Sequence, residues 1–128
     1  MALNFLKRRS ILKKLNYLEA TPIRQCEYET AENGAVTLVI PKFRNEKFNN
    51  FMLGPRKRFF RIALDELGSH VWLQIDGHTK VAGICSKVYE ICGDKIMPVE
   101  QRVTKFLTML YEARYITFAE IENEIAKS

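Results

Sequence analysis

Histidine and cysteine are the residues of this chain with the widest chemistry, because they can ligate metals, attack as nucleophiles and transfer protons. The chain has two histidines and three cysteines. His70 falls on an expected helix and His78 in a loop, and neither is spaced with a cysteine or an acid as a zinc site requires. The sequence also contains no glycine-rich phosphate loop and no nucleophile elbow. It therefore predicts no catalytic residue, no metal, no cofactor and no enzyme activity.

The cysteines indicate the compartment. Cys26, Cys85 and Cys92 are odd in number, and the last two share an expected helix. Seven residues of helical rise would hold those two about 10 Å apart, too far for a disulfide. Reduced cysteines are typical of a reducing compartment. The N-terminal segment 1–15 is interrupted by charges, and no apolar run approaches the roughly 20 residues that cross a bilayer. We expect a cytoplasmic protein that does not span or bind a membrane.

Charge is distributed unevenly along the chain. The net charge of +5 divides into 13 basic and 5 acidic residues over 1–64, and 7 basic and 10 acidic residues over 65–128. One basic cluster occupies residues 7–14 and a second occupies residues 56–61. Such clusters attract anionic partners, which include nucleic acid, membrane surfaces and acidic peptides. We interpret the first cluster as solvated surface and the second as a candidate binding surface.

The first half of the chain reads as strands. Residues 23–30 alternate in polarity, Asn33-Gly34 suits a tight hairpin turn, and residues 36–40 resume the alternation until Pro41. Residues 58–64 read as a third strand with Arg61 facing outward. Its expected core-facing residues are Phe60, Ile62 and Leu64. These patterns predict an N-terminal three-stranded antiparallel sheet.

The second half reads as three helices. Asp65 is an expected N-cap and Gly77 an expected stop for the first helix, on which Trp72 should be buried. Thr79 is an expected N-cap for the second helix, and Pro98 suits the start of the third. The apolar stripes of the three helices are Leu67, Val71 and Ile75; Val81, Ile84, Cys85, Val88 and Cys92; and Val99, Val103, Phe106, Leu107 and Leu110. Residues 115–118 form a candidate short strand, and one or two helical turns follow.

Strands followed by helices predict an α+β fold that is winged helix-turn-helix-like. We divide the chain into a basic amphipathic extension over 1–22, a single domain over 23–118 and an acidic tail over 119–128. A long basic insert at 42–57 interrupts that domain.

The order and spacing of the residues at the helix ends and on the apolar helix faces resemble those of a known family. The residues in register are Leu64, Asp65, Glu66, Gly68, Trp72, Asp76, Gly77, Thr79, Val81, Ile84, Gly93, Pro98, Val103, Phe106, Leu107 and Leu110. This pattern resembles the coenzyme PQQ synthesis protein D (PqqD) family over residues 24–118. Lys80 and Gly83 depart from it, because relatives often carry a threonine and a glutamate there as a capping box. We expect a weaker start to the second helix.

The resemblance implies a function in peptide capture without catalysis. Members of this family act as recognition elements for ribosomally synthesised and modified peptides. The leader of the precursor adds as a strand beside the third strand, lies against the third helix and is presented to a modifying enzyme. By this resemblance the partners are an acidic leader and an enzyme of the radical SAM type, in PQQ or a similar pathway. The implied peptide-binding residues are Arg58, Phe59, Phe60, Arg61, Ile62, Arg102, Lys105, Phe106 and Met109.

Two other functions stay open. A winged helix can place its third helix in the major groove of DNA. Residues 98–115, however, mix acidic with basic side chains, which disfavours binding driven by phosphate contacts. The chain could also be a structural subunit tethered to a larger enzyme. The sequence does not decide whether the chain forms a homodimer.

Overall fold

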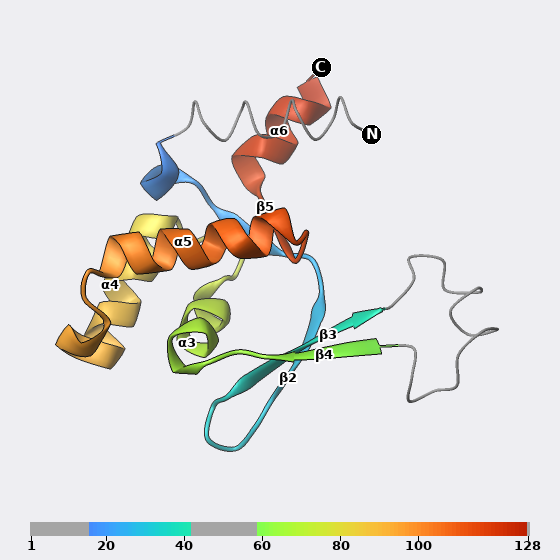
Figure 1. The fold of residues 1–128 in the computed structure, drawn as a ribbon. Helices are drawn as coiled ribbons and strands as arrows, with labels where there is room; N and C mark the ends of the chain where they lie inside the picture. Colours follow the sequence, from blue (N-terminus) through green and yellow to red (C-terminus); the bar gives the residue numbers. More distant parts are fainter. Residues whose placement is uncertain (1–15, 42–58, 128) are drawn as a thin grey trace. The chain divides into compact units, whose positions relative to one another are not determined.

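The computed structural model describes residues 16–41 and 59–127, which form an α+β fold of strands and helices (Figure 1). Sequence predictions that concern residues 1–15 and the basic insert at 42–57, as well as Arg58, lie outside the described part. The described helices include none that is long and apolar enough to cross a membrane. The chain divides into two compact units, one comprising residues 26–69 and the other residues 1–25 with 70–128.

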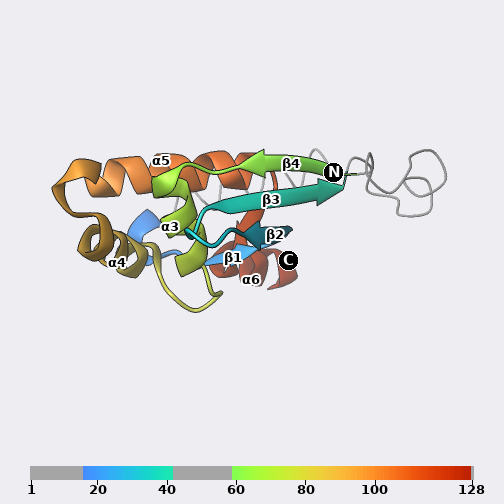
Figure 2. The ribbon, with the colours of Figure 1, turned by 90° about the horizontal axis from the view of Figure 1, so that it is seen from below.

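The first of these units contains the predicted three-stranded antiparallel sheet. Its strands are β2 (Glu27–Thr30), β3 (Val36–Pro41) and β4 (Phe59–Ala63), in the order β2-β3-β4 (Figure 2). Leu38 lies opposite Tyr28 on one side and Ile62 on the other. Where the β3–β4 ladder ends, the N–H of Val36 donates to Ser69 Oγ at 2.9 Å. Ser69 thereby ties the sheet to the helix that follows β4.

The β2–β3 hairpin is closed by a three-residue loop. Ala31 donates its N–H to the carbonyl of Ala35, and the N–H of Gly34 donates back to Ala31, both at 2.9 Å. Gly34 has a φ of 87°, whereas Asn33 is not among the residues with positive φ. A two-residue type I′ turn would require positive φ at both central residues. The turn prediction is therefore correct in place, but the loop is one residue longer than the tight turn.

Helix α3 (Glu66–Gln74) begins as predicted but ends three residues before the predicted stop at Gly77. Asp65 Oδ1 accepts the Gly68 N–H at 2.7 Å, which caps the first turn, and Gly77 beyond the helix has a φ of 81°. Trp72 is fully buried, as expected. Its carbonyl accepts hydrogen bonds from the Arg24 guanidinium, at 2.8 Å from Nη2 and 3.2 Å from Nε. A cation thereby satisfies a carbonyl at the C-terminal end of α3.

The prediction of one continuous strand over 23–30 is wrong. Residues Pro22–Arg24 form β1, which pairs antiparallel with β5 (Ile116–Phe118) in a separate two-stranded sheet. The Gln25 N–H donates to the Tyr115 carbonyl at 2.9 Å and extends this pairing, and β2 then begins at Glu27 in the other sheet. Local alternation is the same for both strands, so it could not reveal that the partners differ. A short 3-10 helix, η1 (Tyr17–Glu19), precedes β1.

The helices after α3 form the rest of the second unit. They are α4 (Val81–Cys92), the 3-10 helix η2 (Gly93–Ile96), α5 (Val99–Glu112) and α6 (Ala119–Lys127). The apolar stripes of α4 and α5 are buried largely as predicted. The fully or nearly fully buried members are Val81, Ile84, Cys85, Val88, Val99, Val103, Leu107 and Leu110. Cys92 and Phe106 are only half-buried. The short helix expected in the acidic tail is confirmed as α6, in which Ile121 is fully buried.

Thr79 does not cap α4, contrary to the prediction. The N-cap is Lys80, whose side chain makes no capping hydrogen bond. The N–H and hydroxyl of Thr79 instead donate to the Asp76 carboxylate, at 2.7 and 2.9 Å. Because the Thr79 hydroxyl is hydrogen-bonded to Asp76, α4 begins without a side-chain cap. This agrees with the weaker start of the second helix that we expected from Lys80 and Gly83.

Candidate functional site

Strand β4 is an edge strand of the described three-stranded sheet, and β3 is its neighbour (Figure 2). The N–H of Leu64 donates to the Val36 carbonyl on β3 at 2.9 Å. Backbone groups of alternate residues point to the same side of a strand, so Ile62 and Phe60 also direct theirs toward β3. The N–H and C=O of Arg61 and Ala63 are therefore directed to the outer side of the strand, where an added peptide would pair.

The side chains of β4 are more exposed than predicted. Phe60 and Ile62 lie opposite Ile40 and Leu38, so they share the sheet face on which Leu38 is fully buried. Phe60 is nevertheless 54% exposed, and Ile62 is half-buried. Phe60 therefore lies on the predicted face of the sheet, but it is not buried there. Ile40, which lies opposite Phe60, is the second-last residue of β3 and is itself only half-buried.

Arg61 carries an ion pair across the sheet. Its Nη1 lies 2.5 Å from Oε2 of Glu29 on β2, and the two side chains are 60% and 59% exposed. The hydrogen bond that Arg61 donates to the Glu29 carboxylate, reinforced by the negative charge of Glu29, raises the pKa of Arg61. The guanidinium that the sequence assigned to an acidic leader therefore already has an acidic partner within the protein.

Helix α5 presents the other four predicted residues on one face. Arg102, Lys105, Phe106 and Met109 follow the three- and four-residue spacing of a helical stripe. Arg102 and Lys105 are exposed, Phe106 is half-buried and Met109 is 60% exposed. Arg102 also donates from Nη1 to the Lys95 carbonyl at 3.2 Å. This face combines two cations with accessible apolar surface.

The structure therefore gathers the predicted binding residues into two groups, one on each compact unit. Phe59, Phe60, Arg61 and Ile62 form the β4 strip, and the four α5 residues form the α5 face. The sequence prediction omitted Ala63. Ala63 could have been predicted from the sequence, because it lies two positions after Arg61 and therefore directs its backbone N–H and C=O to the same side of the strand.

The thiols of Cys26 and Cys85 do not resemble activated nucleophiles. Burial, followed by the charge of Glu27, raises the pKa of Cys26 to about 11. Burial also raises the pKa of Cys85. A thiol with a raised pKa stays protonated at neutral pH and attacks slowly.

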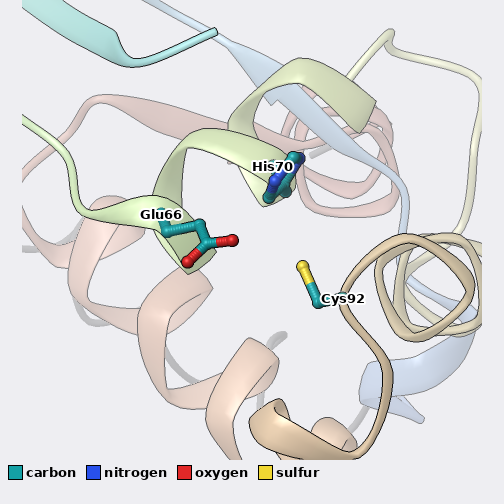
Figure 3. A group of neighbouring side chains, drawn as sticks. All are labelled: Glu66, His70 and Cys92. Atoms are coloured by element: carbon teal, nitrogen blue, oxygen red, sulfur yellow. The ribbon is translucent and has the colours of Figure 1, made fainter. Parts of the chain in front are cut away.

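A group of metal-ligating residue types was missed by the sequence reading. Glu66, His70 and Cys92 lie near one another in the described part of the chain, and their potential ligand atoms are within 4.8 Å of one another (Figure 3). Glu66 stands one helical turn before His70, which was a readable signal. Cys92 follows His70 by 22 positions, and only packing of the chain brings the two together.

The fold defines a small α+β protein in which a three-stranded antiparallel sheet precedes several short helices. Residues 51–116 match the family model described as coenzyme PQQ synthesis protein D (PqqD), and this match covers more than half of the chain. The chain belongs to the coenzyme PQQ synthesis protein D family. No curated protein and no solved structure gives a significant match. The match includes all nine predicted binding residues but not the β2–β3 hairpin, which the sequence resemblance had included.

Proposed function

We propose that the protein is a non-catalytic peptide adaptor. It binds the leader of a ribosomally synthesised precursor peptide by strand addition to β4 and presents that peptide to a modifying enzyme. The family membership supports a role in the synthesis of PQQ or of a similar modified peptide. The observation that carries the proposal is the position of β4 at the end of the sheet, with the backbone of Arg61 and Ala63 directed outward.

Charge favours β4 over the opposite end strand. β2 is four residues long and carries the exposed acids Glu27 and Glu29, which would repel an acidic leader. β4 carries Arg61 together with the aromatic side chains of Phe59 and Phe60. Backbone pairing along an end strand gives affinity for any extended peptide, and side chains beside it select the sequence. An acidic leader with apolar residues is therefore the ligand that best suits β4.

The α5 face is the second part of the proposal. Arg102 and Lys105 supply positive charge, and Met109 supplies a polarisable side chain that adapts to irregular apolar partners. We assign this face a separate contact with the leader. We further assign the recognition domain to residues 23–118, the modifying enzyme to the radical SAM type and the location to the cytoplasm.

An NMR titration of the full chain tests the adaptor function. The probes are short synthetic peptides whose sequences are encoded beside this gene. Saturable shifts in the amides of Arg61 and Ala63, with further shifts on α5 around Lys105, support strand addition and the α5 contact. Protection of the Arg61 and Ala63 amides from hydrogen exchange in the complex would show that the peptide pairs with the backbone. Peptide binding that leaves the β4 amides unshifted overturns the assignment of the β4 edge.

A gel-shift series against salt separates peptide capture from nucleic-acid binding. The α5 helix carries Glu100 and Glu112 as well as Arg102 and Lys105, so its formal charge is balanced. Binding driven by phosphate contacts weakens steeply as salt rises. Tight, steeply salt-dependent binding to duplex DNA would therefore contradict the adaptor, and weak binding agrees with it. Sedimentation of the free chain shows whether a second copy competes for the β4 edge.

A further inference from the structure

His70 and Cys92 bring an imidazole and a thiol together within one compact unit. His70 lies on α3 and Cys92 is the last residue of α4, and a ring nitrogen of the first lies within 4.8 Å of the sulfur of the second (Figure 3). Both side chains are half-buried, so they are partly shielded from water yet reachable by an ion. These two residues are 22 positions apart in the sequence, so the pair does not form a short zinc-binding motif that could be recognised from sequence spacing.

Glu66 adds a carboxylate to the imidazole through the helix itself. It precedes His70 by four residues on the continuous helix α3, so the two side chains lie on the same face. A carboxylate oxygen of Glu66 lies within 4.8 Å of the imidazole. Glu66 is exposed, so an ion can reach its carboxylate from solvent. The helix thereby presents two donors of different chemistry one turn apart.

The donor types select the ion. Magnesium and calcium prefer shells made of oxygen, whereas a thiolate and an imidazole favour zinc and similar transition metals. Zinc bonds to sulfur at about 2.3 Å and to nitrogen at about 2.0 Å, so tetrahedral donors lie about 3.5 Å apart. The observed separations of up to 4.8 Å would have to close by about 1 Å, which rotation of the side chains can supply. Three protein donors would leave a fourth position for water.

We propose that His70, Cys92 and Glu66 bind one zinc ion. The ion links α3 to the end of α4 and stabilises the folded chain, because a ligand that binds the native state and not the unfolded state shifts the folding equilibrium. Binding requires the deprotonated thiol, so it releases a proton and weakens as the pH falls.

Cobalt and zinc titrations of the reduced full-length chain test this site. Cobalt serves as a spectroscopic probe, because a cobalt ion bound to a thiolate shows a charge-transfer band in the ultraviolet. We expect one cobalt per chain, displaced by zinc. Cys92→Ser should abolish the band, and both Cys92→Ser and His70→Gln should weaken zinc binding at least about tenfold. Glu66→Gln should weaken zinc binding but keep the band.

The chain offers matched controls for each ligand. Cys26→Ser removes a thiol elsewhere, and His78→Gln removes the other histidine, which is exposed in a loop. Neither change should alter the cobalt band or the zinc affinity. Unchanged zinc affinity in Cys92→Ser, or loss of the band in Cys26→Ser, would overturn the site. Unchanged zinc affinity in Glu66→Gln would overturn the three-ligand arrangement.

A measurement on the unaltered chain keeps the test independent of variant folding. Zinc should slow the alkylation of Cys92, mapped by mass spectrometry, while alkylation of Cys26 serves as the internal reference. Protection of Cys92 that is reversed by a chelator supports the proposal. Equal rates for Cys92 with and without zinc contradict it.

Discussion

Arg61 Nη1 lies 2.5 Å from Glu29 Oε2, so the cation best placed to attract an acidic leader on β4 is already paired across the sheet. Both side chains are largely exposed, and exposed pairs contribute little to stability because water screens them. An acidic residue of the leader would have to compete with Glu29 for the guanidinium. The pair therefore adds little to the stability of the sheet, and under the proposed function Glu29 competes with the leader for Arg61.

Replacing Glu29 by Gln should tighten leader binding. The change releases the Arg61 guanidinium and removes a negative charge from the sheet, so the affinity for an acidic leader should rise about two- to fivefold while the melting temperature changes little. Calorimetric titration with the leader checks the affinity. Glu32→Gln, in the exposed hairpin loop, makes the same change in net charge away from Arg61 and should have a smaller effect. Equal effects of the two substitutions would mean that net charge, and not the ion pair, controls binding.

Charge reversal tests the two cationic surfaces separately. Arg61→Glu on β4 and Lys105→Glu on α5 should each weaken binding of an acidic leader about tenfold or more, because a favourable charge becomes a repulsive one. Both residues are exposed, so the melting temperature should stay nearly constant. Lys87→Glu on the exposed surface of α4 is the control for the change in net charge. If it weakens binding as strongly as the other two, the leader is attracted by total charge alone.

Proline at Ala63 tests strand addition directly. The Ala63 N–H is directed away from β3, so Ala63→Pro removes a donor for an added strand and spares the β3–β4 ladder. Leader affinity should fall by about tenfold, the equivalent of one lost hydrogen bond. Ala63→Ser keeps the N–H and should bind normally. A leader that binds the proline variant with full affinity would contradict backbone pairing at this position.

A serine at the N-cap of α4 should stabilise the protein. Lys80 has the extended backbone of a cap, with φ of −74° and ψ of 159°, but no capping hydrogen bond. Its ammonium pairs with Glu19 at 2.8 Å on the exposed surface. Lys80→Ser and Lys80→Ala both lose this pair, and only serine can accept from the N–H groups of Ala82 and Gly83 in the first turn; the Val81 N–H already donates to the Ala20 carbonyl at 2.9 Å. Thermal unfolding should show Lys80→Ser more stable than Lys80→Ala by about 1 kcal/mol, whereas equal stability would mean that α4 needs no cap.

The turn after α3 should depend on pH through Asp76. Its carboxylate accepts the N–H groups of His78 and Thr79 at 2.8 and 2.7 Å, and these hydrogen bonds lower the pKa of Asp76 to about 2 from 3.8. A lowered pKa in the folded state contributes stability above pH 3.8, and that contribution is lost as the pH falls toward 2. Carboxyl NMR titration should give a midpoint near 2.

An asparagine at this position supplies the control. Asp76→Asn keeps an acceptor oxygen but loses the charge, so it should melt at a lower temperature than the unaltered protein at neutral pH. The difference between the two proteins should shrink below pH 3.8. A carboxyl midpoint near 3.8 would contradict the role of these hydrogen bonds.

The sequence by itself determined the capping residues and the apolar faces of the helices, because these features depend on residues within one helical turn of one another. Asp65 caps the start of α3 as expected, Gly77 has the expected positive φ, and Trp72 and Leu107 are buried as predicted. Caps, positive φ and helical periodicity are local properties that residue types report directly. The same local signals identified the family.

Only the tertiary structure decided which distant residues meet. The pairing of β1 with β5, the hydrogen bonds from Arg24 to the end of α3, the ion pair of Arg61 with Glu29 and the approach of His70 to Cys92 all join segments far apart in the chain. The alternation of a β-strand does not specify which strand it pairs with, and the sequence position of a charged residue does not specify its ion-pair partner. Arg61 was therefore readable from the sequence as an outward-facing cation, but its partner Glu29 was not.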